Sequence, residues 1–248
     1  MLVMNREASR GRFRRWLPRI GATAVGCILV GVAAGWMCYR YIPTWYQPAY
    51  VPIEDEQAAR DELGAAFTAL SRGMGRGETF EFIVRQDELN RWLVARHRIW
   101  PASKRWIPEQ IEGPMIVFGE GEVILAGTWS GPGPRSVISI RVQVEADAGQ
   151  LRTRVTSVRG GALPFPLGPI KRELSRLEVD RDGHPRPLLP DDTSILDAVE
   201  GAPLPRDISW SQPRGKFRVE SLTITLGELR ARLRPIKCKS RRSPRVAR

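Results

Sequence analysis

Few residues of this 248-residue chain have the types and spacing that a reactive centre needs. No serine or cysteine stands in a Gly-x-Ser-x-Gly or Cys-His pattern, and the two histidines, His97 and His184, lie in an arginine-rich segment and a Gly/Pro-rich segment. The adjacent acids Asp87-Glu88 and Asp191-Asp192 supply too few oxygen ligands for calcium, and such pairs favour helix starts. Three cysteines argue against a disulfide framework. We therefore expect no catalytic residue, no metal and no cofactor, and a protein that is not an enzyme.

Side chains suited to binding are easier to find than side chains suited to catalysis. Asn90 lies one residue from the apolar face of its segment, where a buried amide either bonds the backbone of a neighbouring strand or contacts a ligand. We take Asn90, Trp92, Trp129 and Phe165 as candidate contacts for a ligand or a partner protein. Five tryptophans could line an apolar groove or could belong to the core and its edges, namely Trp92, Trp100, Trp106, Trp129 and Trp210.

The net charge of +12 is concentrated at the two ends of the chain. Residues 1–19 carry six arginines and one glutamate, and residues 229–248 carry seven arginines and two lysines without an acid. Residues 20–228 therefore have a net charge of −2. A nucleic-acid-binding domain normally carries its positive charge on the folded body. Nucleic-acid binding is thus weakly supported and would have to use the basic tail.

An uncharged stretch of 20 residues, 20–39, lies between Arg19 and Arg40. As a helix it would be about 30 Å long, which matches the apolar thickness of a bilayer. The arginines before it place the N-terminus in the cytoplasm. We therefore expect a cell-membrane protein with a basic cytoplasmic segment at 1–19, a single transmembrane helix at 20–41 and an extracytoplasmic main domain.

The flanks of this stretch are rich in aromatic residues, which gather at membrane interfaces because their rings are partly apolar and partly polar. Residues 42–53 follow with three prolines and form a stiff stalk. Two alternatives remain for the apolar stretch, a signal peptide cleaved near Val32-Ala33-Ala34 and a lipoprotein modified at Cys27. The expected interface residues are Trp16, Trp36, Tyr39, Tyr41, Trp45 and Tyr46.

After the stalk, segments whose apolar residues have a helical period flank a segment that is typical of a strand. Residues 54–72 and 87–98 repeat apolar side chains at three- and four-residue steps, which predicts two amphipathic helices. Gly73, Gly75 and Gly77 are expected to end the first helix. Residues 79–84 are rich in aromatic and branched side chains and predict a strand between the two helices.

The second half of the chain has the two-residue period of half-buried strands. We expect a hairpin of 115–118 and 123–129 about Gly119-Glu120-Gly121, followed by strands at 138–145 and 151–156. A rigid loop is expected at 160–166 and a helix from Pro169. An irregular stretch at 180–215 with a short helix at 194–199 then leads to a closing hairpin of 217–226 and 229–233. Together they predict one α+β domain at 54–235, in which a curved antiparallel sheet packs on amphipathic helices. A disordered basic tail is expected at 236–248.

Three segments carry a resemblance to a known family. They are FEFIVRQDELNRWL at 80–93, VRGGALPFP at 158–166 and FRVESLTITLGELRARLRP at 217–235. Their order resembles that of the YpmS-like family of bacterial membrane-anchored proteins of unknown function. The resemblance implies an anchored extracytoplasmic domain and transfers no active site. The stalk aromatics and the long basic tail depart from the family pattern.

These observations favour a binding protein of the cell envelope. We expect a single-pass, membrane-anchored, non-enzymatic protein whose extracytoplasmic domain binds a lipid-like ligand or a partner protein. The alternative is a structural or scaffolding subunit of an envelope complex without a small ligand. The expected partners are the membrane and either a lipid or another envelope protein, with no metal, and nucleic acid is the least favoured partner.

Overall fold

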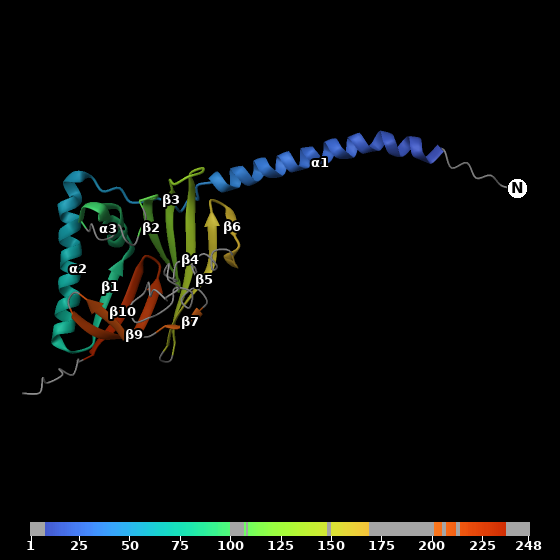
Figure 1. The fold of residues 1–248 in the computed structure, drawn as a ribbon. Coiled ribbons are helices and arrows are strands. Elements are labelled where there is room, and N and C mark those ends of the chain that lie inside the picture. The colour runs from blue at the N-terminus through green and yellow to red at the C-terminus, as the bar shows by residue number, and fades with distance from the viewer. Residues whose placement is uncertain are drawn as a thin grey trace, which may run out of the picture.

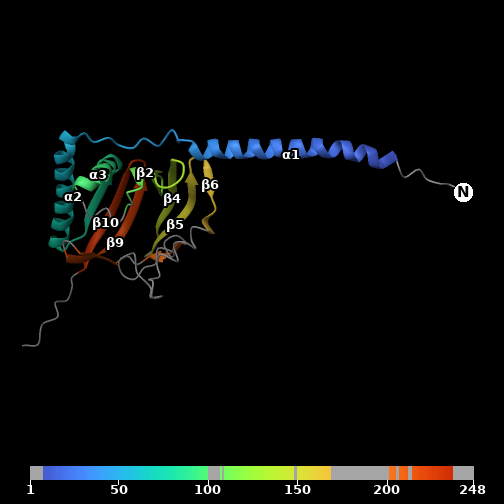
Figure 2. The same cartoon turned by 45° about the horizontal axis from the view of Figure 1, so that its top comes forward.

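The computed structural model describes residues 8–99, 107, 109–147, 150–168, 201–204, 207–211 and 214–236. It is an α+β protein with a long helix, α1 (Ala8–Arg40), that projects away from the remainder (Figures 1 and 2). Within the described residues, Ala22–Arg40 is the one helical stretch long and apolar enough to cross a membrane. Its side chains are unburied, as Met37 illustrates with 74% of its surface exposed. The folded domain therefore does not cover the apolar surface of α1.

An extended segment leads from α1 to the second helix. Prolines at 43, 48 and 52 prevent a continued helix, as expected for the stalk, and a single 3-10 turn follows at Ile53–Asp55. Helix α2 (Glu56–Arg76) ends at Gly77, whose left-handed φ of 72° suits a C-terminal cap. Gly73 was also expected to end the helix but lies inside it. A Cβ atom there would lie 2.6 Å from the Phe80 ring, so Gly73 allows close packing rather than termination.

The first sheet has four antiparallel strands in the order β1-β10-β9-β8. It contains β1 (Phe80–Arg85), β8 (Asp207–Ser211), β9 (Arg214–Thr225) and β10 (Glu228–Ile236). The expected alternation along the closing hairpin is confirmed, because Ala231 and Leu233 are buried while Arg230 and Arg232 are exposed. The buried side chains meet Leu70 of α2 in one apolar cluster.

The second sheet follows the path β2-β3-β4-β5-β6, and β7 also pairs with β5. Its strands are β2 (Ile111–Gly119), β3 (Glu122–Trp129), β4 (Ser136–Asp147), β5 (Gln150–Gly160), β6 (Leu163–Phe165) and β7 (Gly201–Leu204). The hairpin about Gly119-Glu120-Gly121 is confirmed, with Gly119 opposite Glu122. The two sheets meet at their turns, where the Gly227 N–H donates to Phe118 O at 3.2 Å and the Gly121 N–H donates to Ile224 O at 3.0 Å.

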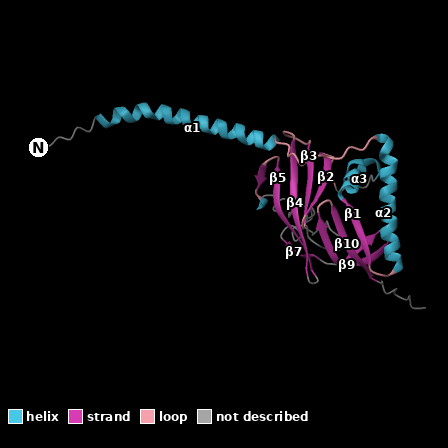
Figure 3. Ribbon diagram, turned by 180° about the vertical axis from the view of Figure 1, so that it is seen from behind, coloured by secondary structure: helices cyan, strands magenta, loops and turns pink. Residues whose placement is uncertain are grey.

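Helix α3 (Gln86–Ile99) follows β1 directly and lies beside α2 at the end of the domain away from α1 (Figure 3). Three expectations need correction. The single curved sheet is two sheets, the loop at 160–166 contains β6, and the stretch at 180–215 contains β7 and β8. The short edge strands were missed because backbone pairing, not apolar periodicity, defines them. The helices expected from Pro169 and at 194–199 lie outside the described residues.

Candidate ligand cavity

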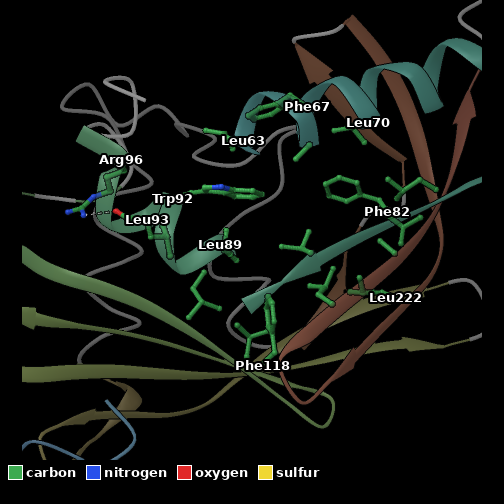
Figure 4. Close-up of a pocket in the computed structure, with 18 of the residues that line it drawn as sticks. Leu63, Phe67, Leu70, Phe82, Leu89, Trp92, Leu93, Arg96, Phe118 and Leu222 are labelled. Atoms are coloured by element: carbon green, nitrogen blue, oxygen red, sulfur yellow. Dashed lines mark hydrogen bonds between the residues drawn. The ribbon is translucent and has the colours of Figure 1, made fainter. Parts of the chain in front are cut away.

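A cavity of about 630 Å³ lies between the two helices and the two sheets (Figure 4). Helices α2 and α3 form one side, and the first sheet and the turn of β2 and β3 form the other. Its size falls in the range of about 300–1,000 Å³ that is typical of small-molecule sites. The described lining residues are Leu63, Ala66, Phe67, Leu70, Phe82, Val84, Leu89, Trp92, Leu93, Arg96, Ile99, Ile107, Ile116, Phe118, Val123, Leu151, Phe217, Val219, Leu222, Leu229, Ala231 and Leu233.

The cavity results from the way α2 meets the rest of the domain. The C-terminal half of α2 packs on the first sheet through Leu70 and Met74. Its N-terminal half is joined to α3 by ion pairs, Glu62–Arg91 at 3.2 Å and Glu56 with Arg98. These contacts hold the two helices together. The described residues leave the space beside Leu63 and Phe67 of α2 unfilled (Figure 4).

The lining is chemically uniform. Every described lining residue except Arg96 is apolar, and the side chains include four phenylalanines and Trp92 among leucines, isoleucines, valines and alanines. Interiors of proteins are normally packed as densely as organic crystals, so an apolar space of this size inside a domain is unusual. Its walls offer dispersion contacts and the exclusion of water, which suit an aliphatic or aromatic ligand.

Arg96 is the one charged residue in the described lining. Only 5% of its surface is exposed, and its guanidinium donates to Leu93 O at 2.9 Å and to Ile111 O at 3.0 Å. Desolvation by burial lowers the pKa of Arg96 from its ordinary value, but an arginine still keeps its charge at neutral pH. Figure 4 shows Arg96 on the side of the cavity away from Phe82 and Leu222. Its charge therefore lies at one end of the apolar space.

Asn90 holds α3 against the open edge of the second sheet. Strand β2 is an edge strand, and the Asn90 side chain pairs with the backbone of Ile116 in both directions, at 2.7 and 2.9 Å. One turn earlier, Gln86 Oε1 accepts from the Phe118 N–H at 2.8 Å. The two side chains therefore form hydrogen bonds with backbone groups of β2 that a neighbouring strand would otherwise form. The backbone-bonding interpretation of Asn90 is confirmed, and the structure does not place Asn90 in the described cavity lining.

The other candidate contacts are spread over the domain. Trp92 lines the cavity, and its buried indole N–H has no hydrogen-bond partner among the described residues. Trp129 lies at the far end of β3, where its indole N–H reaches Pro132 O at 3.5 Å. Phe165 of β6 packs edge-on against Tyr39 with ring centroids 6.5 Å apart. Trp100 and Trp106 lie outside the described residues, and of Trp210 only the backbone in β8 is described.

Five of the six aromatic residues expected at a membrane interface fall into three groups. Trp36, Tyr41 and Trp45 are exposed around the end of α1, as an interface position requires. Tyr39 is partly covered by Phe165. Trp16 lies in α1, in the part where only the backbone is described.

Tyr46 does not occupy the membrane-interface position that was expected for it. Only 8% of its surface is exposed, and its hydroxyl bonds Gly113 O at 2.8 Å and Thr128 Oγ1 at 3.0 Å. Desolvation by burial raises the pKa of Tyr46 above its ordinary value. The Tyr46 side chain therefore fixes the stalk to β2 and β3 and is not free to face a bilayer.

Arg96 and Phe118 line the cavity but were not predicted from the sequence to be site residues. Arg96 lies three and four residues after Leu93 and Trp92, which places it on their helical face and could have indicated a buried cation. Phe118 was predicted to be in a strand, but its approach to the helices depends on how the two sheets meet.

No metal site is indicated in the part of the chain that the structure describes, because it brings together no group of three or more histidine, cysteine or acidic residues. No protein-family model, curated protein or solved structure that we compared with this chain matches it. The resemblance to the YpmS-like family therefore stays a prediction. Arguments about function rest on the cavity and on α1.

Proposed function

We propose that this chain is a single-pass, membrane-anchored, non-enzymatic envelope protein whose extracytoplasmic domain binds a lipid-like ligand. The observation that carries the proposal is the cavity of about 630 Å³ with its apolar lining. Each methylene group moved from water into such a space contributes about 0.8 kcal/mol, so an acyl chain is a fitting occupant. A purely structural subunit without a ligand would gain stability by filling the same space with side chains.

The anchor half of the proposal is supported by α1. Its apolar side chains lie unburied along 19 residues, from Ala22 to Arg40, and exposing them to water would be costly. Trp36, Tyr41 and Trp45 surround the end of this stretch, at the level where interface aromatics are expected. The arginines before the stretch favour a cytoplasmic N-terminus and an extracytoplasmic domain.

Protease added to the outside of intact spheroplasts is expected to digest the domain and to leave an N-terminal fragment of the membrane-bound protein. An epitope tag placed before Met1 identifies the fragment, and its mass shows whether residues 1–40 are still attached. A tag that is absent from the mature protein would show cleavage of a signal peptide. Protection of the domain in intact spheroplasts, with digestion after lysis, would contradict the orientation.

Filling the cavity should abolish ligand binding. Ala66 lines the cavity from α2, and Ala66→Trp places an indole inside it. We expect binding of a fluorescent fatty acid by the full-length protein to weaken by at least about tenfold. The indole would occupy the space that buries the acyl chain. Ala65→Trp is the matched control, because Ala65 is exposed on the same helix and its substitution should leave binding unchanged.

Native mass spectrometry after mild detergent extraction provides the second measurement. The wild-type protein should carry co-purifying lipid, and the Ala66→Trp protein should not. Near-UV circular dichroism checks that both variants are folded. Absence of bound lipid in the wild type, together with no uptake of the fluorescent fatty acid, would reject the lipid proposal and favour the scaffolding alternative.

A further inference from the structure

A second, polar recess lies on the opposite face of the six-stranded sheet from the cavity. Val123 lines the cavity, and its neighbour Ile124 lines the recess, so the alternation of β3 separates the two sites. The recess has a volume of about 170 Å³ and is lined by Tyr41, which directly follows α1, and by Trp45 of the stalk. Its floor is formed by polar residues of β4 and β5.

Two arginines and two serines alternate on the floor of this recess. In the register of β4 and β5, Ser139 lies opposite Arg159 and Arg141 lies opposite Ser157. Side chains in such positions are close enough to contact one ligand. Arg141 is paired with Glu122 at 3.5 Å, so its charge is balanced. Arg159 is exposed and forms no ion pair with any residue that the structure describes.

Ser139 shows that the recess is suited to a polar ligand. Only 7% of its surface is exposed, and its hydroxyl lines the recess without a hydrogen-bond partner among the described residues. The hydroxyl is not among the fully buried polar atoms without a partner, so it is open to the recess and can bond a ligand there. A ligand oxygen bound between Ser139 and Arg159 would satisfy it. The uncompensated charge of Arg159 then calls for an anion.

The recess also lies beside the end of α1. Ala162 lines it, and the Ala162 N–H donates to Cys38 O in the last turn of α1 at 2.8 Å. If α1 crosses a bilayer, the recess lies in the headgroup layer directly above its apolar core. Guanidinium and hydroxyl groups together are the usual ligands of phosphate oxygens, and a phosphodiester carries the single negative charge that balances Arg159.

We propose that this recess binds the phosphate group of a phospholipid headgroup in the membrane that α1 anchors. The proposal rests on the anchor half of the proposed function and is independent of the apolar cavity. It would fix the height and orientation of the domain on the membrane.

The test uses full-length protein in a non-ionic detergent, titrated with dihexanoyl phosphatidylglycerol and followed by native mass spectrometry. Dihexanoyl glycerol, which lacks the phosphate, and inorganic phosphate are the comparison ligands. We expect phosphatidylglycerol to bind more tightly than either. Arg159→Gln should weaken its binding by about tenfold or more, the factor expected when a charge-assisted hydrogen bond is lost, and Ser139→Ala by a smaller factor.

Arg152→Gln is the matched control, because Arg152 is exposed on the same strand outside the recess and its loss removes the same charge. Equal affinities for phosphatidylglycerol and dihexanoyl glycerol, or unchanged binding in Arg159→Gln, would overturn the proposal. Inorganic phosphate binding as tightly as the lipid would overturn the assignment to a headgroup. The Ala66→Trp protein should retain this binding, so a failure of the cavity proposal is distinguishable from a failure of this one.

Discussion

Replacing Asn90 with leucine should destabilise the protein by about 3 kcal/mol, although the two side chains have similar sizes. The substitution removes both hydrogen bonds to Ile116 and leaves its partly buried N–H and C=O without a partner on the edge of β2. Each unsatisfied buried group costs about 1–3 kcal/mol, and the added apolar surface offsets only part of this loss. Urea unfolding of the detergent-solubilised protein measures the change.

Two measurements separate this effect from a general loss of helix stability. Asp87→Leu alters an exposed residue of the same helix and should cost less than about 1 kcal/mol, mainly through the helix dipole. Hydrogen exchange should show faster exchange of the Ile116 amide in Asn90→Leu than in Asp87→Leu. Equal destabilisation by the two substitutions, or an unchanged exchange rate at Ile116, would contradict the role of Asn90.

Periodicity predicted the cavity walls but not the cavity. The apolar faces expected for residues 54–72 and 87–98 do line it, through Leu63 and Phe67 on α2 and through Leu89 and Leu93 on α3. An apolar face looks the same in a sequence whether it meets a close-packed core or an empty space. The difference lies in how α2 is placed, with Leu70 and Met74 packed on the first sheet and Glu56 and Glu62 paired with arginines of α3.

Contacts between residues far apart in the sequence account for the remaining differences between the predicted and the observed surroundings of side chains. Phe165 was predicted to contact a ligand or a partner protein, and in the structure its ring packs on Tyr39, 126 positions earlier. Tyr46 belongs by composition to the aromatic flank of a membrane span, and only its bonds to Gly113 and Thr128 place it inside the domain. Residue type predicts what a side chain prefers to contact, but not which element will be beside it.

The largest structural effect at the end of the domain beside α1 is expected for Gly161→Ala. Gly161 has a φ of 59°, and a Cβ atom there would collide with the carbonyl oxygens of Cys38 and Tyr39 in the last turn of α1. Those oxygens accept from the Ala162 N–H at 2.8 Å and from Ser136 Oγ at 2.6 Å, so the domain caps the helix end. We expect a loss of about 3 kcal/mol, because backbone strain adds to the displacement of α1.

The matched control is Gly121→Ala, which separates strain from collision. Gly121 has a similar φ of 68°, but a Cβ atom there would meet nothing within 4 Å, so only the strain of about 1 kcal/mol remains. In a background with Cys27→Ser and Cys238→Ser, opening of the helix end should raise the maleimide labelling rate of Cys38 in Gly161→Ala and leave it unchanged in Gly121→Ala.

Equal labelling rates in the two variants would show that the domain does not hold the helix end. The recess that contains Arg159 would then lose its fixed place beside the end of α1, because the Ala162–Cys38 contact joins the recess to α1. A higher rate in Gly161→Ala alone would instead mean that α1 and the domain move as one body. The position of α1 would in that case decide which face of the six-stranded sheet can meet a headgroup, and the face that carries Arg159 lies beside the end of α1.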